Sequence, residues 1–128
     1  MNVQRVSTNS PWEPVVGYSR AVRRGNIVAV TGTVGLEADG SASPSLQRQA
    51  ERSLEIIVET LGKLGASPSD VIRTRMFVTD ISRWQEVAAA HAAVFGDVLP
   101  ATTMVEVSRL ISPEYLIEIE ADAVLDRD

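Results

Sequence analysis

The chain has 128 residues, of which 45% are hydrophobic, 23% are charged and only 5% are aromatic. Its 12 Lys and Arg residues are outnumbered by 17 Asp and Glu residues, and the resulting net charge of −5 argues against nucleic-acid binding as the main function. The chain has no cysteine and one histidine, which excludes disulfides, thiolate zinc sites and a cysteine nucleophile.

Two short strands joined by a tight turn are the first elements that the sequence predicts. They follow an irregular lead-in over residues 6–17, which is rich in Ser, Pro and Gly. Residues 18–22 and 27–31 supply the strands, and the Gly-Asn pair between them favours a hairpin because both residue types tolerate positive φ. Residues 34–44 contain two glycines and several small polar residues, which predicts a loop.

A first long helix is predicted over about residues 45–64. Ser43 and Pro44 would supply an N-cap and a proline at the first helical position, and Gly65 marks the end of the helix. Apolar residues recur here at steps of three and four, the spacing of one helical face, at Leu46, Ala50, Leu54, Ile57, Leu61 and Leu64.

The rest of the chain predicts three strands and one more helix. Residues 71–79 alternate as a strand does, and a second helix is expected from Trp84 to Gly96, opened by a capping box at Ser82. Further strands are expected at residues 102–107 and 115–124. On the strand at 71–79, one face should hold Ile72, Thr74, Met76 and Val78, and the other Arg73, Arg75 and Phe77.

This order of elements predicts one domain over residues 1–128, with a sheet of about five to six strands and two helices. Two helices can cover only one face of such a sheet. The other face carries Thr, Arg and Glu among apolar residues, so it is either solvated or buried against another subunit. The apolar fraction favours the second alternative.

The sequence also bears on where the protein works. No stretch reaches the roughly 20 apolar residues of a membrane-spanning helix, and the polar N-terminus lacks the apolar core of a secretory signal. We therefore expect a cytoplasmic protein without membrane contact.

Two carboxylates on the last predicted strand are candidates for catalysis. Glu118 and Glu120 lie two residues apart, so both point to the same face, and Glu106 on the preceding strand can join them. Carboxylates placed in this way can position or activate water. The alternative is a solvated strand face, on which Arg73 or Arg75 pairs with these glutamates across an interface.

For two other positions, His91 and the Thr31-Gly32 pair, the sequence allows either a structural or a functional role. His91 lies on the apolar face of the second helix, where a lone histidine is more often a core or interface residue than a catalyst, and it cannot form a metal site by itself. Thr31-Gly32 follows an apolar strand, and a glycine there allows a ligand to approach the backbone closely. The alternative for this pair is a plain turn.

A set of short motifs resembles the YjgF/RidA family of reactive intermediate deaminases, also described as endoribonuclease L-PSP, from about residue 18 to residue 124. In order and at family spacing, the motifs are Tyr18, Gly25-Asn26, Val30-Thr31-Gly32, Phe77-Val78-Thr79-Asp80, Pro100-Ala101-Thr102-Thr103-Met104-Val105-Glu106-Val107 and Ile117-Glu118-Ile119-Glu120-Ala121.

The resemblance implies an α+β, chorismate-mutase-like fold with a mixed sheet. It also implies a homotrimer in which three sheets close a central barrel, with helices outside and ligand clefts between subunits. The family reaction is the hydrolysis of a 2-enamine or 2-imine acid to a 2-keto acid and ammonia. No cofactor and no metal are implied, because the imine carbon is already electrophilic.

The resemblance assigns site residues and one departure from the family. Glu120 matches the glutamate linked to the catalytic water, Tyr18 matches the aromatic residue of the cleft, and Thr31 and Gly32 match its backbone. His91 replaces a tyrosine that is common in the family. Thr102 stands where the deaminases carry the arginine that binds the substrate carboxylate.

Because this departure removes the carboxylate-binding charge, two functions stay open. One is a divergent hydrolase of imines or enamines, with weak or no activity on the usual 2-imino acids. The other is a non-catalytic trimer that binds a metabolite or a protein partner. Ribonuclease activity is a third and weaker alternative, because the chain is acidic and lacks a basic stripe.

Overall fold

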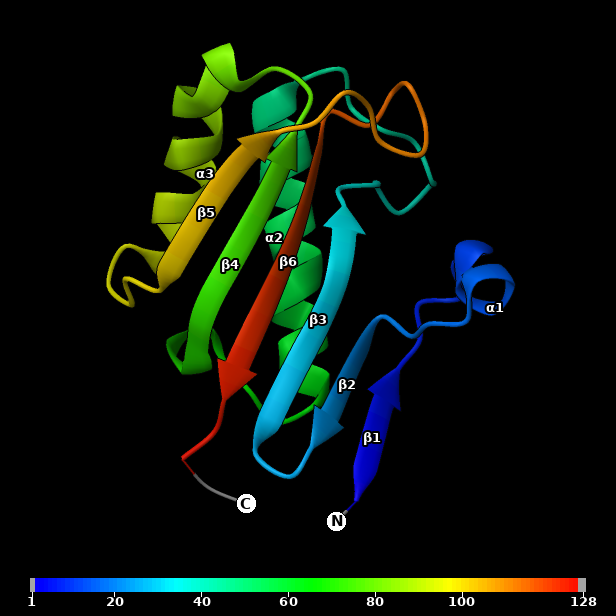
Figure 1. Cartoon of the computed structure of the whole chain (residues 1–128), viewed down its shortest axis with the longest axis vertical. Coiled ribbons are helices and arrows are strands. Elements are labelled where there is room, and N and C mark those ends of the chain that lie inside the picture. Colours follow the sequence, from blue (N-terminus) through cyan, green and yellow to red (C-terminus); the bar gives the residue numbers. More distant parts are fainter. Residues whose placement is uncertain (1, 127–128) are drawn as a thin grey trace.

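Six strands form one mixed sheet in residues 2–126, the part of the chain that this computed structural model describes. The strand order is β1-β2-β3-β6-β4-β5, and only β4 and β5 are parallel neighbours (Figure 1). The fold class predicted from the sequence is therefore confirmed. The strands are β1 Val3–Val6, β2 Ala21–Arg24, β3 Ile27–Val34, β4 Val71–Val78, β5 Ala101–Glu106 and β6 Ile117–Val124.

The two long helices, α2 (Leu46–Lys63) and α3 (Trp84–Phe95), cover one face of this sheet (Figure 1). Two single-turn 3₁₀ helices, η1 (Pro68–Asp70) and η2 (Ile81–Arg83), precede β4 and α3. The core lies between the helices and the sheet. It is built from aliphatic residues and one aromatic residue, including Val28, Val30, Leu54, Ile57, Leu61, Val78, Val87, Phe95, Ile117 and Ile119.

The N-terminal segment is more ordered than the expected irregular lead-in. It contains β1 at the sheet edge and the short helix α1 (Trp12–Val16). The carboxylate of Glu13, which is 6% exposed, organises this turn by accepting hydrogen bonds from Ser7, Thr8 and Ser10. These elements are too short to show a hydrophobic period, so sequence patterning could not predict them.

The N-terminal caps of both long helices differ from the predictions, although each helix starts within one residue of its predicted position. Helix α2 is capped by Ser45, whose Oγ accepts from the backbone N–H of Arg48 at 3.2 Å, and not by Ser43. The capping box expected at Ser82 is absent, because both the backbone N–H and the hydroxyl of Ser82 donate to the carboxylate of Asp80. The turn η2 precedes α3, which begins at Trp84 as predicted.

One predicted strand face is also interrupted. The register between β4 and β6 shifts between Val71 and Arg73, so Val71 is buried and Ile72 is 54% exposed. Beyond this irregularity, Thr74, Met76 and Val78 face the helices as predicted.

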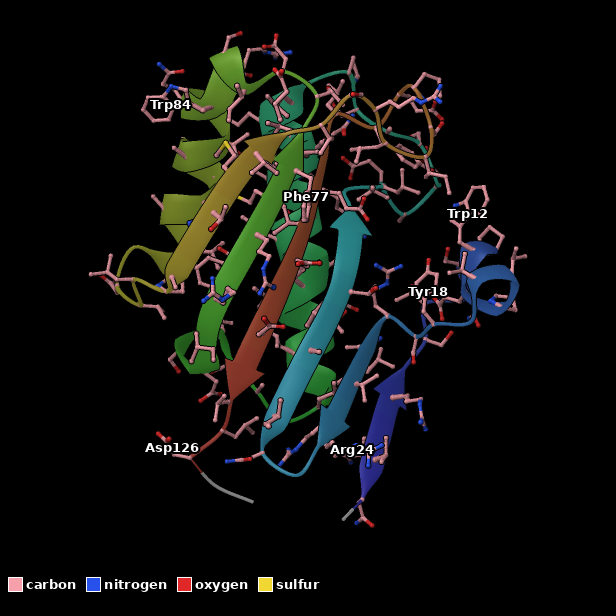
Figure 2. All side chains as sticks on the ribbon, in the orientation of Figure 1. Trp12, Tyr18, Arg24, Phe77, Trp84 and Asp126 are labelled. Atoms are coloured by element: carbon pink, nitrogen blue, oxygen red, sulfur yellow. The ribbon has the colours of Figure 1, made fainter. Side chains whose placement is uncertain are left out.

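The second face of the sheet is uncovered in the single chain. It carries half-buried acidic and basic side chains together with apolar ones such as Ile27, Phe77 and Val105, of which Ile27 is 59% exposed (Figure 2). This mixed face matches the sequence expectation. The trimeric barrel that would cover it stays a prediction.

Candidate functional site

A cavity of about 740 Å³ opens beside the N-terminal segment, between α1, the end of β3 and the outer side of α2. Its volume lies within the range of roughly 300–1,000 Å³ that is common for small-molecule sites. Tyr18 lies between α1 and β3 and lines the cavity (Figure 2). Apolar side chains from three other segments also line it, namely Trp12, Val16, Ile56 and Ile111.

The cavity exists because one edge of β3 has no strand beside it. Strand β2 begins at Ala21, which pairs with Val30, and the last link between the two segments is the hydrogen bond from Thr31 N–H to the carbonyl of Arg20, at 3.0 Å. The register of β3 against β6 then shifts between Val30 and Thr33. The backbone at Gly32 therefore lies at an open, irregular edge where a ligand can reach it.

The side chain of Arg20 occupies part of this open edge. Arg20 is 8% exposed, and its Nη1 donates to the carbonyl of Gly32 at 2.9 Å and to Oγ1 of Thr33 at 3.1 Å. The guanidinium carbon lies 5.8 Å from the centroid of the Tyr18 ring, which is within the range of a cation–π contact. Arg20 thus joins the backbone and the aromatic wall of the cavity.

Gly32 is required for a second close approach. A Cβ at this position would collide with Oε2 of Glu118 and would lie 2.9 Å from its Cδ. The glycine therefore allows the Glu118 carboxylate to lie directly against the β3 backbone. Glu118 also lines the cavity, so the structure brings Tyr18, Thr31, Gly32 and Glu118 together.

The environment of Glu118 disfavours its charged form. Burial raises the pKa of this carboxyl group, the charge of Arg20 lowers it in part, and the charge of Glu120 raises it further. A carboxyl group with a raised pKa is a better proton acceptor once it is ionised. This is the electrostatic profile of a group that activates water.

The raised pKa predicts how Glu118→Gln changes stability with pH. Below about pH 4.5 the carboxyl is protonated in both the folded and the unfolded chain, so it contributes no pH dependence. As pH rises above 4.5, the unfolded chain releases the proton first, so Glu118 lowers the stability of the native state. The variant should therefore gain stability over the wild type between pH 4 and pH 7, as measured by denaturant unfolding at fixed protein concentration. If the difference in unfolding free energy between the variant and the wild type were the same at pH 4 and pH 7, the raised pKa would be contradicted.

Glu120 occupies a different environment on the same strand. It accepts a hydrogen bond from Nη1 of Arg75 at 3.1 Å, and the same Nη1 lies 3.2 Å from Oδ2 of Asp122. The expected pairing of Arg75 with Glu120 therefore occurs within one chain. Glu120 is not among the described residues that line the cavity. Glu106 does not join either glutamate, because its carboxylate accepts from the backbone N–H of Ile81.

His91 and Thr102 meet each other through Thr74, far from the cavity. The fully buried Thr74 hydroxyl lies 2.9 Å from Nε2 of His91 and 2.8 Å from Oγ1 of Thr102. Burial lowers the pKa of His91, so the neutral imidazole is favoured, and its ring lies 4.8 Å from that of Phe95. In the single chain His91 has the structural role of a half-buried, hydrogen-bonded residue.

One chain thus holds the predicted site residues in two separate groups. Thr102 pairs in register with Thr74, which faces the helices, whereas Glu118 lies on the uncovered face. Strand β5 is also three positions from β3 in the sheet, a separation of about 14 Å at the usual strand spacing. Only a contact between two subunits can bring Thr102 and the cavity into one cleft.

Sequence reasoning missed the role of Arg20 and preferred Glu120 to Glu118 as the catalytic residue. The alternation of residues 117–121 places both glutamates on one face and cannot separate them. What separates them is the irregular edge of β3 at Gly32, a tertiary feature. The sequence gives only a weak indication that Arg20 belongs to the site, namely that it lies two residues after Tyr18.

Two further observations concern the described residues as a whole. In residues 2–126, no group of three or more His, Asp or Glu side chains converges as metal ligands would. None of the helices in this range combines the length and the apolar character that crossing a membrane requires.

Comparison with known proteins gives consistent matches over nearly the whole chain. A family model described as endoribonuclease L-PSP matches residues 8–125. A RutC family protein of Pyrococcus abyssi is 30% identical over 120 residues, covering 92% of this chain and 94% of that protein. The 2-iminobutanoate/2-iminopropanoate deaminase of Salmonella typhimurium is 29% identical over 123 residues, covering 93% of this chain and 95% of the deaminase.

A solved structure shares both the fold and much of the sequence. It is a member of the YjgF/YER057c/UK114 family from Mycobacterium tuberculosis, with a TM-score of 0.90 and 48% identity. The match covers 97% of this chain and 100% of that one, so the two folds correspond over nearly their whole length.

Proposed function

The chain belongs to the YjgF/RidA family, described by the endoribonuclease L-PSP model, and from this membership we propose that it is a cofactor-independent hydrolase of reactive imines or enamines. The observation that carries the proposal is the half-buried Glu118 carboxylate, held against the open backbone of Gly32 in a cavity of ligand size. The family includes deaminases of 2-imino acids, and this site has the groups that such a reaction needs.

The reaction adds water to a carbon–nitrogen double bond. Ionised Glu118 accepts a proton from a water molecule as the water oxygen bonds to the imine carbon, and the nitrogen takes up a proton from solvent to give a carbinolamine. Glu118 then returns its proton to the nitrogen, the carbon–nitrogen bond breaks and ammonia leaves, while the hydroxyl proton passes to solvent and a carbonyl forms. Positioning accounts for much of the rate, because the imine carbon is already electrophilic.

The other cavity residues have binding roles in this proposal. The ring of Tyr18 packs against the organic part of the substrate, and the backbone of Thr31 and Gly32 supplies hydrogen bonds at the open edge of β3. Thr102 and His91 complete the cleft from a neighbouring subunit. Glu120, the residue preferred from the sequence, holds Arg75 on the adjoining surface.

The cleft between subunits requires an oligomer, and a homotrimer is the second part of the proposal. The support is the uncovered, half-apolar sheet face, together with the separation of the predicted site residues on strands β3 and β5, which lie three positions apart in one sheet. Light scattering at micromolar concentration should give about three times the chain mass of 13.8 kDa. A monomer at that concentration would refute both the trimer and the shared cleft.

The activity itself is tested with imines generated in situ from amino acids, with ammonia or the keto product as the readout. We expect hydrolysis above the spontaneous rate for part of a substrate panel. The usual 2-iminobutanoate and 2-iminopropanoate should be poor substrates, because the neutral Thr102 hydroxyl adds no charged carboxylate contact on its side of the cleft and their short side chains leave the apolar part of the cavity unfilled. A trimer that binds keto products but accelerates no imine in the panel would contradict the hydrolase proposal.

Thr102→Arg should raise the activity on these two small 2-imino acids by at least tenfold. This increase needs only about 1.4 kcal/mol of additional transition-state stabilisation, which a charged hydrogen bond can supply. The measurement is kcat/KM for the variant and the wild type in the coupled ammonia assay. Thr103→Arg is the matched control on the same strand, because Thr103 pairs with Arg75 and points to the other face. Equal gains in both variants would show that position 102 has no special role.

A further inference from the structure

Arg20 is a buried cation that lines the cavity, and among residues 2–126 its charge acts on the Glu118 carboxyl without an ion-pair contact. Three cationic side chains line the cavity. Arg52 lies 3.3 Å from the carboxylate of Glu55, and Lys63 lies 3.9 Å from that of Glu59. Within residues 2–126, no carboxylate oxygen lies within 4.0 Å of the Arg20 guanidinium, although Arg20 is the most buried of the three.

Part of the Arg20 guanidinium is also available for a ligand. Only Nη1 has protein acceptors among the described residues, the Gly32 carbonyl and the Thr33 hydroxyl. The described part of the chain contains no fully enclosed side-chain nitrogen that lacks a partner, so Nε and Nη2 keep contact with the open space beside them. A guanidinium can present two parallel N–H groups, the geometry that matches a carboxylate.

We propose that Arg20 binds the anionic group of the ligand and so replaces, from the opposite wall of the cleft, the charge that Thr102 does not provide. This inference rests on the proposed function for the chemical step, but the anion site itself does not depend on catalysis. A charged group held beside Gly32 lies next to Glu118, where the water is activated. The Nη1 hydrogen bonds fix the guanidinium in place before the ligand arrives.

The apolar lining of the cavity defines the rest of the ligand. Trp12, Val16 and Ile111 line the cavity and are 41%, 67% and 62% exposed, so their apolar surfaces are free to contact a ligand. An apolar substituent placed there removes both surfaces from water. The ligand class is therefore a carboxylate with an apolar side chain larger than that of the two small 2-imino acids, which would reach Arg20 but leave the apolar wall uncovered.

A binding experiment with stable keto acids tests this assignment without measuring turnover. The probes are 4-methyl-2-oxopentanoate, its neutral methyl ester and the smaller 2-oxobutanoate, each titrated calorimetrically. The wild type should bind 4-methyl-2-oxopentanoate at least tenfold more tightly than the ester and at least fivefold more tightly than 2-oxobutanoate. Equal affinity for acid and ester would overturn the anion site, and equal affinity for the two acids would overturn the apolar subsite.

Two variants of matched chemistry locate the site. Arg20→Gln should reduce the preference for acid over ester to less than twofold. Arg23→Gln removes a half-buried arginine that donates to the carbonyls of Gly25 and Leu64, outside the cavity, and should keep the full preference. A folded Arg20→Gln protein that retains the preference would overturn the proposal.

If Arg20→Gln does not fold, a measurement on the wild type still tests whether Arg20 binds the anion. In an NMR titration, 4-methyl-2-oxopentanoate should shift the Arg20 Nε–H and Gly32 amide signals. Shifts confined to other arginines, such as Arg75, would overturn the assignment. Acid binding with these shifts but without imine hydrolysis would leave the anion site standing and refute the hydrolase proposal alone.

Discussion

Glu118→Gln should abolish most imine hydrolysis and lower kcat at least 100-fold on the best substrate of the panel. The amide keeps the size of the side chain and its position against Gly32, but it cannot accept a proton from water. General-base catalysis typically contributes about 10²–10⁴-fold to a rate, so this loss is the expected size of the effect. Because ligand contacts are kept, KM should change much less than kcat.

Glu120→Gln is the matched control for this experiment. It makes the same chemical change two residues away on the same face of β6. Glu120 contacts Arg75 and does not line the cavity, so the substitution removes an ion pair and no cavity group. We expect it to retain most of the activity while losing some stability. The reverse result, a strong loss for Glu120→Gln and a weak one for Glu118→Gln, would return the catalytic role to Glu120 and require that subunit contacts rearrange this surface.

Gly35→Ala should lower the free energy of unfolding by about 3 kcal/mol, the largest loss of stability that we expect from a single added methyl group. A Cβ at Gly35 would collide with the backbone carbonyl of Gln49 and lie 2.9 Å from the backbone nitrogen of Ser53, both in α2. Helical backbone cannot move aside as a flexible side chain does.

The close contact at Gly35 also supports buried hydrogen bonds that the substitution would disturb. Ser53 Oγ donates to the carbonyl of Thr33 at 2.7 Å, and the Gln49 amide donates to the carbonyls of Ser43 and Glu114. The control is Gly62→Ala, near the end of α2, where the added Cβ meets nothing within 4 Å. Denaturant unfolding should show a gain of about 0.5–1 kcal/mol for this variant. Equal effects of the two substitutions would show that the contact at Gly35 is unimportant.

The parts of the fold with a clear hydrophobic period were predictable from the sequence. Helix α2 and strand β6 show this best, because each repeats one pattern over several turns or alternations, and their ends agree within about two residues. The N-terminal β1 and α1 were not predictable, since their order depends on the Glu13 carboxylate and on pairing with β2. The register shift that exposes Ile72 also follows from pairing between distant segments.

In the candidate site, too, some features were predictable from the sequence and others depend on the pairing of distant segments. Tyr18, Thr31 and Gly32 are close in sequence or joined by one hairpin, so family spacing could place them together. The choice between Glu118 and Glu120 depends on which carboxylate meets an irregular strand edge. The distance between Thr102 and the cavity depends on the strand order, and neither feature has a local signature in the sequence.

Strand β5 lies at one edge of the sheet, paired with β4 on one side only among the described strands. Its free side offers a row of backbone donors and acceptors to any extended segment that approaches it. In the proposed trimer, this edge and the uncovered face would tie the stability of each chain to the number of other copies around it. By mass action, dilution of such a trimer should lower its melting temperature, and a newly made chain would be most open to aggregation and proteolysis before it assembles.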